Sequence, residues 1–274
     1  MINNLKMTVL IDNIAGEPLV SEWGLSILIE ADGKKILLDT GASGQFTRNA
    51  ERLAIDLSDV DIGVLSHAHY DHADGIEAFF SCNSQAVFLI REGCRENCYG
   101  IKDGAFRYNG IRRGTLAQFA ERICFVSGVY SVAEGIWLLP HRAGDYTQIS
   151  LRNDLYVMEH ERYLPDNFAH EQSLVMETEK GLIVFNSCSH AGVENILEDV
   201  WELLGRRDVY AYVGGLHLYK LTDGELSALA EALQSSGIRQ ILTGHCTGVH
   251  AYEFLKDRLG DQINQISAGF TCTL

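Results

Sequence analysis

The fold and the site are indicated most clearly by one stretch of sequence, Asp61-Ile62-Gly63-Val64-Leu65-Ser66-His67-Ala68-His69-Tyr70-Asp71-His72. Residues 61–66 predict a short buried strand, and a His-x-His-x-Asp-His cluster follows it directly. Alternation along an extended segment places the first two histidines on one side, and a turn brings Asp71 and His72 nearby. Imidazoles and carboxylates are ligands that zinc, manganese and iron prefer, so the pattern favours a metal site over an exposed polar loop.

Three later apolar runs each stop at a histidine beside small residues. They lie at 185–190, 213–217 and 242–246. Because loops past strand ends carry the site in layered sheets, we expect these polar groups to converge on one rim. A hydrolytic metal needs further ligands and an open position for water. His190 and His245 are the natural completions, although each, taken singly, could be a hydrogen-bonded core histidine.

Hydrophobic periodicity predicts a mixture of strands and helices. The first forty residues alternate apolar and polar positions, and the pair Asp32-Gly33 predicts the turn of a β-hairpin. Strands are predicted at 7–11, 25–30, 35–39, 173–177, 182–186, 209–213 and 240–243. Helices are predicted at 46–53, 74–80, 194–204 and 223–235. No internal repeat or linker divides the chain, so we expect a single domain over 1–274.

Composition limits the partners and the location that we expect. The chain has 274 residues, with 22 Lys and Arg against 37 Asp and Glu, and a net charge of −15. Lys and Arg provide most phosphate binding, so this balance argues against a nucleic-acid partner. No stretch approaches the roughly 20 apolar residues that a membrane span needs, and the N-terminus lacks a signal-peptide pattern. Seven scattered cysteines without a repeating spacing indicate reduced thiols, which are typical of the cytoplasm. We therefore expect a cytoplasmic protein, and we expect no membrane partner.

The motifs resemble the metallo-β-lactamase fold superfamily over most of the chain. The resemblance rests on Asp39-Thr40-Gly41 at a strand end, on the 67–72 cluster and on the late strand-plus-histidine segments. Segments 187–192, 214–218 and 245–248 are similar to one branch, the 7,8-dihydropterin-6-methyl-4-(β-D-ribofuranosyl)aminobenzene-5′-phosphate synthases, which is implicated in assembling pterin-type cofactors. The resemblance implies an α/β fold, a four-layer αββα sandwich.

The resemblance also implies the metal ligands. Two sets of three side chains would each hold one ion: His67, His69 and His190, and Asp71, His72 and His245. Asp39 would orient the site from behind these ligands. Many members have a bridging aspartate where this chain has Cys188, Ser189 and His190. For the third histidine of the first set, His170 is the second choice after His190. We expect one or two divalent ions, with zinc favoured and manganese, iron or nickel as alternatives.

The implied chemistry centres on activated water. A bound divalent ion lowers the pKa of its water to about 7. We therefore expect a metal-bound hydroxide as the nucleophile, with Asp71 orienting it as a ligand. His217 is not needed in either set, so it is a candidate proton donor or substrate contact, with a supporting hydrogen bond as the alternative role.

A basic segment suggests the charge of the substrate. Residues 91–142 hold eight basic and five acidic side chains in an otherwise acidic chain. Guanidinium groups bind phosphate in pairs, so Arg107, Arg112 and Arg142 are candidate substrate contacts in a lid or cap insertion spanning 91–165. A solvated surface insertion is the alternative.

Together these observations predict a metal-dependent hydrolase or transferase. Its substrate would be a small, anionic molecule, either phosphorylated or pterin-like. A general phosphodiesterase or lactonase is the alternative within enzymes, and a metal-binding regulatory protein without turnover is the alternative outside them. A fold of this kind does not define the substrate, and the oligomeric state stays open.

Overall fold

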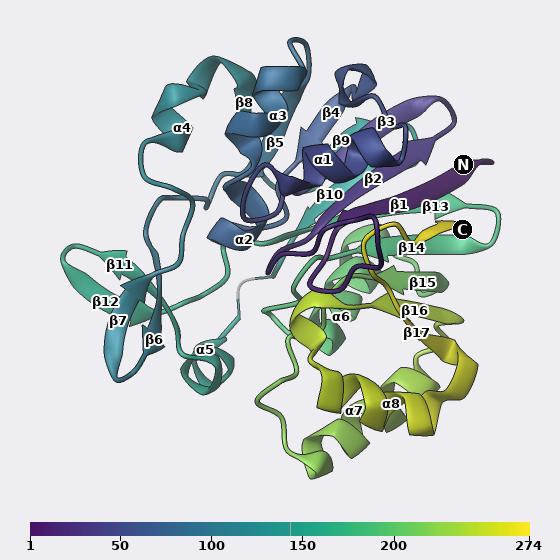
Figure 1. Cartoon of the computed structure of the whole chain (residues 1–274). Coiled ribbons are helices and arrows are strands. Elements are labelled where there is room, and N and C mark those ends of the chain that lie inside the picture. The colour runs from purple at the N-terminus through teal and green to yellow at the C-terminus, as the bar shows by residue number, and fades with distance from the viewer. Residues whose placement is uncertain (143) are drawn as a thin grey trace.

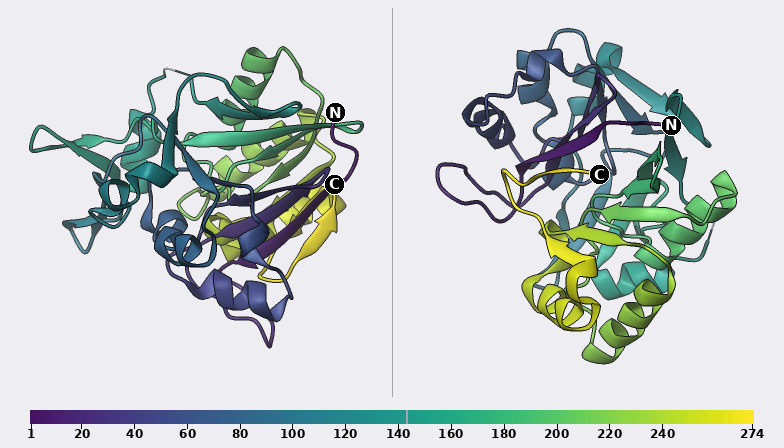
Figure 2. Two further views of the ribbon diagram at one scale, coloured as in Figure 1. Left: turned by 90° about the horizontal axis from the view of Figure 1, so that it is seen from above. Right: turned by 90° about the vertical axis from the view of Figure 1, so that its right-hand side faces the viewer.

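Two sheets packed face to face form the centre of the molecule, and helices cover the outer face of each sheet (Figures 1 and 2). The structure, a computed structural model, describes residues 1–142 and 144–274. The order helix, sheet, sheet, helix confirms the predicted four-layer αββα sandwich.

The first sheet contains mostly N-terminal strands. In spatial order it has seven: β18 (Thr271–Thr273), β1 (Leu5–Ile11), β2 (Ser26–Ala31), β3 (Lys34–Leu38), β4 (Ile62–Val64), β5 (Val87–Arg91) and β8 (Ile123–Val126). The β2–β3 hairpin turns at Asp32-Gly33 as predicted, with φ of 47° and 85°. Positive φ at both central residues is the geometry that suits the twist of paired strands. From β3 to β8 the strands are parallel, so their carboxyl ends share one edge.

The second sheet contains the later strands. In spatial order it also has seven: β17 (Ile263–Gln265), β16 (Gln240–Thr243), β15 (Val209–Val213), β14 (Gly181–Phe185), β13 (Gln172–Thr178), β10 (Ile136–Pro140) and β9 (Tyr130–Ala133). Strands β14 to β17 are parallel. Their carboxyl ends therefore lie at one edge, and the predicted histidine-bearing loops follow three of them.

Alternation along the strands divides their apolar side chains between core layers. On β14, Ile183 and Phe185 join the core between the sheets, whereas Leu182 and Val184 face the helices. The longer helices contribute apolar faces, as amphipathic helices on a sheet do. The eight helices named here are α1 (Gln45–Arg52), α2 (Tyr70–Ala73), α3 (Ile76–Cys82), α4 (Thr115–Gln118), α5 (Thr147–Asn153), α6 (Val193–Leu204), α7 (Asp223–Ser235) and α8 (Val249–Leu259). Within the described residues, no helix has the length and apolar character needed to cross a membrane.

A small third sheet projects beside the carboxyl ends of the large ones (Figure 1). Its four strands are β12 (Arg162–Pro165), β11 (Leu155–Glu159), β6 (Cys98–Lys102) and β7 (Ala105–Tyr108). The range 91–165, which we expected to form a lid or cap, is thus divided, because β8, β9 and β10 between these hairpins belong to the two large sheets.

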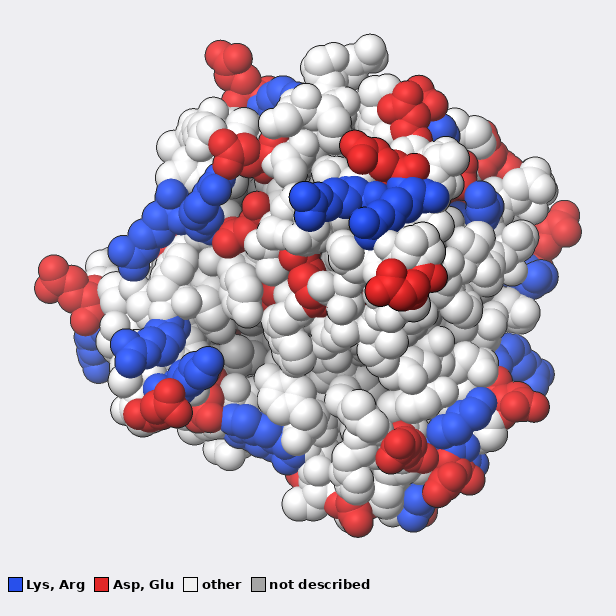
Figure 3. All heavy atoms as spheres, in the orientation of Figure 1, with Lys and Arg blue, Asp and Glu red and all other residues white. Residues whose placement is uncertain are grey.

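Charged side chains are distributed unevenly on the surface. On the face shown in Figure 3, acidic and basic side chains surround a centre that is covered largely by uncharged residues. The excess of acidic residues is therefore not concentrated at this centre.

Candidate metal centre

The predicted ligands converge because the carboxyl ends of strands from both sheets meet at one edge. His67 follows β4, Cys188 and His190 follow β14, and His245 begins the short 3-10 helix η3 (His245–Thr247) after β16. Strand β15 and the loop after it lie between these segments. There Gly214 adopts a φ of 133°, and a Cβ at this position would lie 2.0 Å from the backbone oxygen of Asn186. Only glycine allows the two strand ends to approach so closely.

The three side chains of the first predicted set lie close together. His67 Nε2 lies 3.2 Å from His190 Nε2, and His69 Nδ1 lies 3.0 Å from the same atom. Zinc–nitrogen bonds of about 2.0 Å in a tetrahedron give nitrogen–nitrogen edges of roughly 3.3 Å, close to these distances. Burial, and then the neighbouring histidines, hold the pKa of His67 and of His190 well below the usual range, so both rings are neutral and can donate lone pairs.

The second set combines nitrogen and oxygen donors. His72 Nε2 lies 3.1 Å from His245 Nε2, and Asp71 Oδ2 lies 3.4 Å from His245 Nε2. Burial alone would raise the pKa of Asp71, but His72 and His245 lower it below its ordinary value, so this carboxylate is ionised. Cys188 Sγ approaches His72 Nε2 to 3.2 Å.

Cys188 lies between the two sets. Its sulfur is within 4.8 Å of ligand nitrogens of His67 and His72, and it also groups with His190 and His217 and with His245 and Cys246. The structure thus places this thiol where many relatives were expected to have a bridging aspartate. From the sequence, Cys188 was one of three residues expected in place of that aspartate, and it was not expected in either set.

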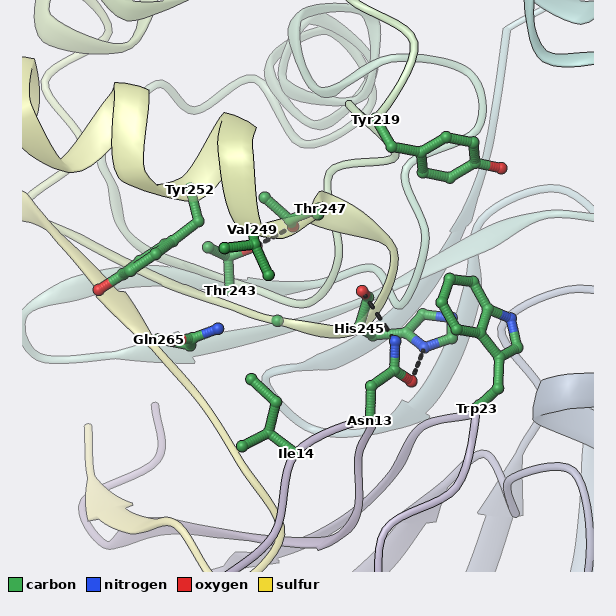
Figure 4. A pocket seen from close by; sticks show the side chains of 12 residues that line it. Asn13, Ile14, Trp23, Tyr219, Thr243, His245, Thr247, Val249, Tyr252 and Gln265 are labelled. Carbon is green, nitrogen blue, oxygen red and sulfur yellow. Dashed lines mark hydrogen bonds between the residues drawn. The ribbon is translucent and has the colours of Figure 1, made fainter.

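Hydrogen bonds fix the far nitrogens of three ligand rings. His67 Nδ1 lies 2.8 Å from Ser66 Oγ, and His72 Nδ1 lies 2.8 Å from Asp39 Oδ2. Asp39 also accepts hydrogen bonds from the backbone and side chain of Ser66. His245 Nδ1 lies 3.1 Å from Asn13 Oδ1 (Figure 4). Such contacts orient the ring and direct the other nitrogen towards a metal. Asp39 therefore lies where the sequence predicted it, whereas Asn13, in the loop after β1, was missed.

His170 lies behind the first set. Its Nε2 donates a hydrogen bond to Asp166 Oδ2 at 2.9 Å, and its Nδ1 accepts one from the backbone of Ala68 at 3.2 Å. Both ring nitrogens of His170 are therefore engaged within the protein. A metal ligand needs a free lone pair on one of them. The geometry therefore favours His190 over His170 in the first set.

His217 lies at the edge of the centre with one free nitrogen. Its Nε2 lies 3.0 Å from Tyr219 Oη, while its buried Nδ1 has no hydrogen-bond partner among the described residues. His217 has a φ of 51°, a left-handed backbone conformation that residues other than glycine rarely adopt. Such conformations are often found at functional sites.

A small cleft opens above the two sets. It has a volume of about 100 Å³. Its lining residues come from both large sheets and from the small sheet: Trp23, His69, Tyr70, Asp71, Asn109, Leu155, Cys188, His190, His217, Tyr219, His245 and Cys246. The ligand atoms are therefore reachable from solvent along this cleft.

The three candidate arginines lie elsewhere. Arg142 forms ion pairs with Asp199, Glu198 and Glu202 of α6 at 2.6–2.8 Å. Arg112 pairs with Glu77 of α3, and Arg107 is exposed on β7. None of the three is among the residues that line the cleft. The guanidinium groups of Arg142 and Arg112 thus form ion pairs with carboxylates on nearby helices.

Comparison with known proteins agrees with this geometry. The model of the Metallo-beta-lactamase superfamily matches residues 24–181, more than half of the chain. The chain belongs to the metallo-beta-lactamase superfamily. A solved member of the superfamily, Tm1679, described as a metal-dependent hydrolase, superposes with a TM-score of 0.84 at 30% identity over 98% of this chain and 99% of that one. A diphosphatase of the PhnP family, at 14% identity and a TM-score of 0.57 over 100% and 98% of the two chains, shares the fold.

One curated relative has a named activity. The 7,8-dihydropterin-6-methyl-4-(beta-D-ribofuranosyl)-aminobenzene-5'-phosphate synthase of Methanocaldococcus jannaschii is 27% identical over 98% of this chain and 96% of its own length. The expected resemblance to that branch of the metallo-beta-lactamase superfamily is therefore confirmed. The relative is named a synthase, which leaves hydrolysis by this chain to be tested.

Proposed function

We propose that the protein is a metal-dependent hydrolase or transferase that acts on a small phosphorylated or pterin-like substrate. The observation that carries this proposal is the convergence of seven buried donors in two adjacent sets around the cleft: His67, His69, His190, Asp71, His72, His245 and Cys188. Ring nitrogens of different buried histidines lie 3.0–3.2 Å apart and converge on the same places, an arrangement that suits a shared cation. The donor set therefore fits a metal centre.

The chemistry of the donors supports zinc. Neutral imidazoles with a thiolate and a carboxylate suit zinc, while manganese, iron and nickel remain alternatives for the same nitrogens. When bound, such ions acidify water and polarise phosphoryl or carbonyl oxygens. Positive charge from the ions would also attract an anionic substrate, a role that we first gave to Arg107, Arg112 and Arg142.

The remaining residues of the cleft provide orientation and proton transfer. In the proposed reaction Asp71 orients the attacking group. His217 Nδ1 exchanges a proton with the substrate, because this nitrogen is free while Tyr219 holds the opposite side of the ring. The small sheet acts as a lid over the cleft and contributes Leu155, while the segment after β7 contributes Asn109. Exclusion of water by this lid would favour transfer to a second substrate over hydrolysis.

Metal content and turnover test the proposal together. We expect close to two metal equivalents in the purified protein, and loss of at least one equivalent together with activity in His69→Ala. His250→Ala is the matched control, because His250 is exposed and pairs only with Asp223. Activity is measured on a generic phosphodiester and on a lactone. A third assay joins a dihydropterin whose 6-methyl group is esterified with phosphate or diphosphate to a phosphorylated aminobenzene riboside, and follows release of that ester group.

Each result has a defined meaning. Metal without turnover of any of these substrates would favour a regulatory metal-binding protein. Hydrolysis of the phosphodiester or lactone alone would favour the general phosphodiesterase or lactonase. A protein that binds no metal would contradict the proposal.

A further inference from the structure

A second hollow lies beside the metal centre, on the far side of His245 (Figure 4). Its volume is about 320 Å³. Its walls come from the β1–β2 loop, the loop after β15, the β16–α8 connection and the end of β17: Asn13, Ile14, Trp23, Tyr219, Thr243, Gly244, His245, Thr247, Gly248, Val249, Tyr252 and Gln265. None of these residues except His245 and Asn13 has a place in the ligand sets or their supports.

Large apolar side chains around this hollow are left in contact with water. The exposed fractions are 43% for Ile14, 51% for Trp23, 49% for Tyr219 and 64% for Val249. They come from three separate segments, yet they gather around one opening. Rings and aliphatic groups that gather at an opening, instead of being scattered singly, mark a binding site.

The hollow adjoins the metal cleft. Trp23, Tyr219 and His245 line both cavities. The Trp23 ring packs on the His245 ring with 5.4 Å between centroids. A molecule seated in the hollow would therefore lie beside His245, next to the metal cleft.

The aromatic walls indicate a flat occupant. Trp23 and Tyr252 lie at opposite ends of the hollow, and Tyr219 lies above it (Figure 4). The amide of Gln265 is exposed and points towards the space between them, where it can bind the polar edge of a ring. A volume near the lower end of the range for small-molecule sites, about 300–1,000 Å³, suits one ring system and is too small for a protein segment.

We propose that this hollow binds a bicyclic, nitrogen-containing aromatic ring of the substrate, and so places the reacting group of that substrate in the metal cleft. Trp23 stacks on the ring and Gln265 hydrogen-bonds its edge. This inference rests on the proposed function in taking the cleft as the place of reaction. Binding of the ring itself does not require metal or turnover.

Binding of free pterin to the metal-free and the metal-loaded full-length protein tests the proposal by equilibrium dialysis. We expect saturable binding in both forms. Trp23→Leu should weaken binding about tenfold or more, as expected for loss of one stacking partner, whereas Trp23→Phe should retain most of it. Gln265→Leu should weaken the binding of pterin more than the binding of naphthalene sulfonate, because naphthalene sulfonate lacks the polar ring edge. Trp201→Leu is the matched control, since Trp201 lies on α6, where its ring packs against Arg207 and does not line the hollow.

Three outcomes would overturn the inference. The first is pterin affinity that Trp23→Leu leaves unchanged. The second is tighter binding of a flexible aliphatic acid such as decanoate than of pterin. The third is a concentration-dependent dimer, broken by Val249→Asp, that covers the opening. Loss of ring binding in Trp23→Leu with normal metal content would separate this inference from the proposed function, which fails only if metal or turnover is absent.

Discussion

Cys188 is the one sulfur donor that we place in the proposed metal centre, and it affects which metal the centre would favour. The thiol lies 3.2 Å from His72 and within reach of both ligand sets. Burial raises the pKa of the free thiol well above its usual range, so metal binding must displace a proton that the folded protein otherwise retains. A softer donor at this position favours zinc over manganese.

At the residue scale, we predict that Cys188→Ser lowers metal content from close to two equivalents to about one. Serine retains the shape of the side chain but lacks a soft, readily ionised ligand. Elemental analysis measures the loss, and cobalt substitution adds a second test, because only a sulfur ligand gives a near-ultraviolet charge-transfer band. Cys94→Ser is the control, since Cys94 is buried but its sulfur donates to the carbonyl of His170. An unchanged metal content and an unchanged cobalt spectrum would contradict the assignment.

At the element scale, a buried ion-pair group joins strand β10, helix α6 and the loop that carries His190. His141 Nε2 lies 2.7 Å from Glu171, and its Nδ1 lies 3.1 Å from Asp199 of α6. Glu171 also accepts hydrogen bonds from the backbone of His190 and Ala191. The same carboxylate therefore holds the ligand loop and the imidazole together.

The charge of His141 should make stability depend on pH. Burial alone lowers the pKa of His141, but Glu171 and Asp199 outweigh it and raise the pKa to about 9, above the ordinary value of 6.5. A raised pKa contributes stability that is complete below pH 6.5 and is lost as pH rises through 9. We expect the midpoint of urea unfolding to fall over this window, and to fall less in His141→Gln.

The pH prediction has an internal control. The exposed His250–Asp223 pair is solvated on both sides, so His250→Gln should leave the pH dependence of the parent protein unchanged. A midpoint that stays constant from pH 6.5 to 9 in the parent protein would contradict the assigned role of His141.

At the scale of the whole molecule, the site joins the two halves of the sandwich. His67, His69 and His72 lie in the segment that follows a strand of the first sheet, β4. His190 and His245 follow strands β14 and β16 of the second sheet. Ions held between them would therefore link the sheets in addition to the apolar core. A ligand that binds only the folded state stabilises it by RT ln(1 + [L]/Kd), about 4 kcal/mol at a thousandfold excess over Kd.

We therefore predict that removal of metal by a chelator lowers the melting temperature by several degrees, and that added zinc restores it. Differential scanning calorimetry measures both changes. The double variant His69→Ala, His245→Ala should melt near the metal-free temperature and should not respond to zinc. Equal melting temperatures for the parent protein with and without metal would show that the ions do not link the sheets.

The local sequence predicted the strands β1–β4 and β13–β16, which lead into the site, but it did not predict the strands β5–β12, β17 and β18. Asp32-Gly33 predicted the hairpin, and the 67–72 cluster predicted a metal site because its side chains are adjacent in the chain. The completing histidines could be predicted because each follows an apolar strand in a parallel sheet, where carboxyl ends share an edge.

Tertiary structure decided what depends on residues distant in the sequence. The choice of His190 over His170 depends on Asp166 and Ala68, which hold both nitrogens of His170. The arginines are taken up by carboxylates of other helices, and the aromatic hollow gathers side chains from segments that are more than two hundred residues apart in the chain. A local pattern specifies the type of ligand, whereas folding alone determines which groups neutralise it or lie beside it.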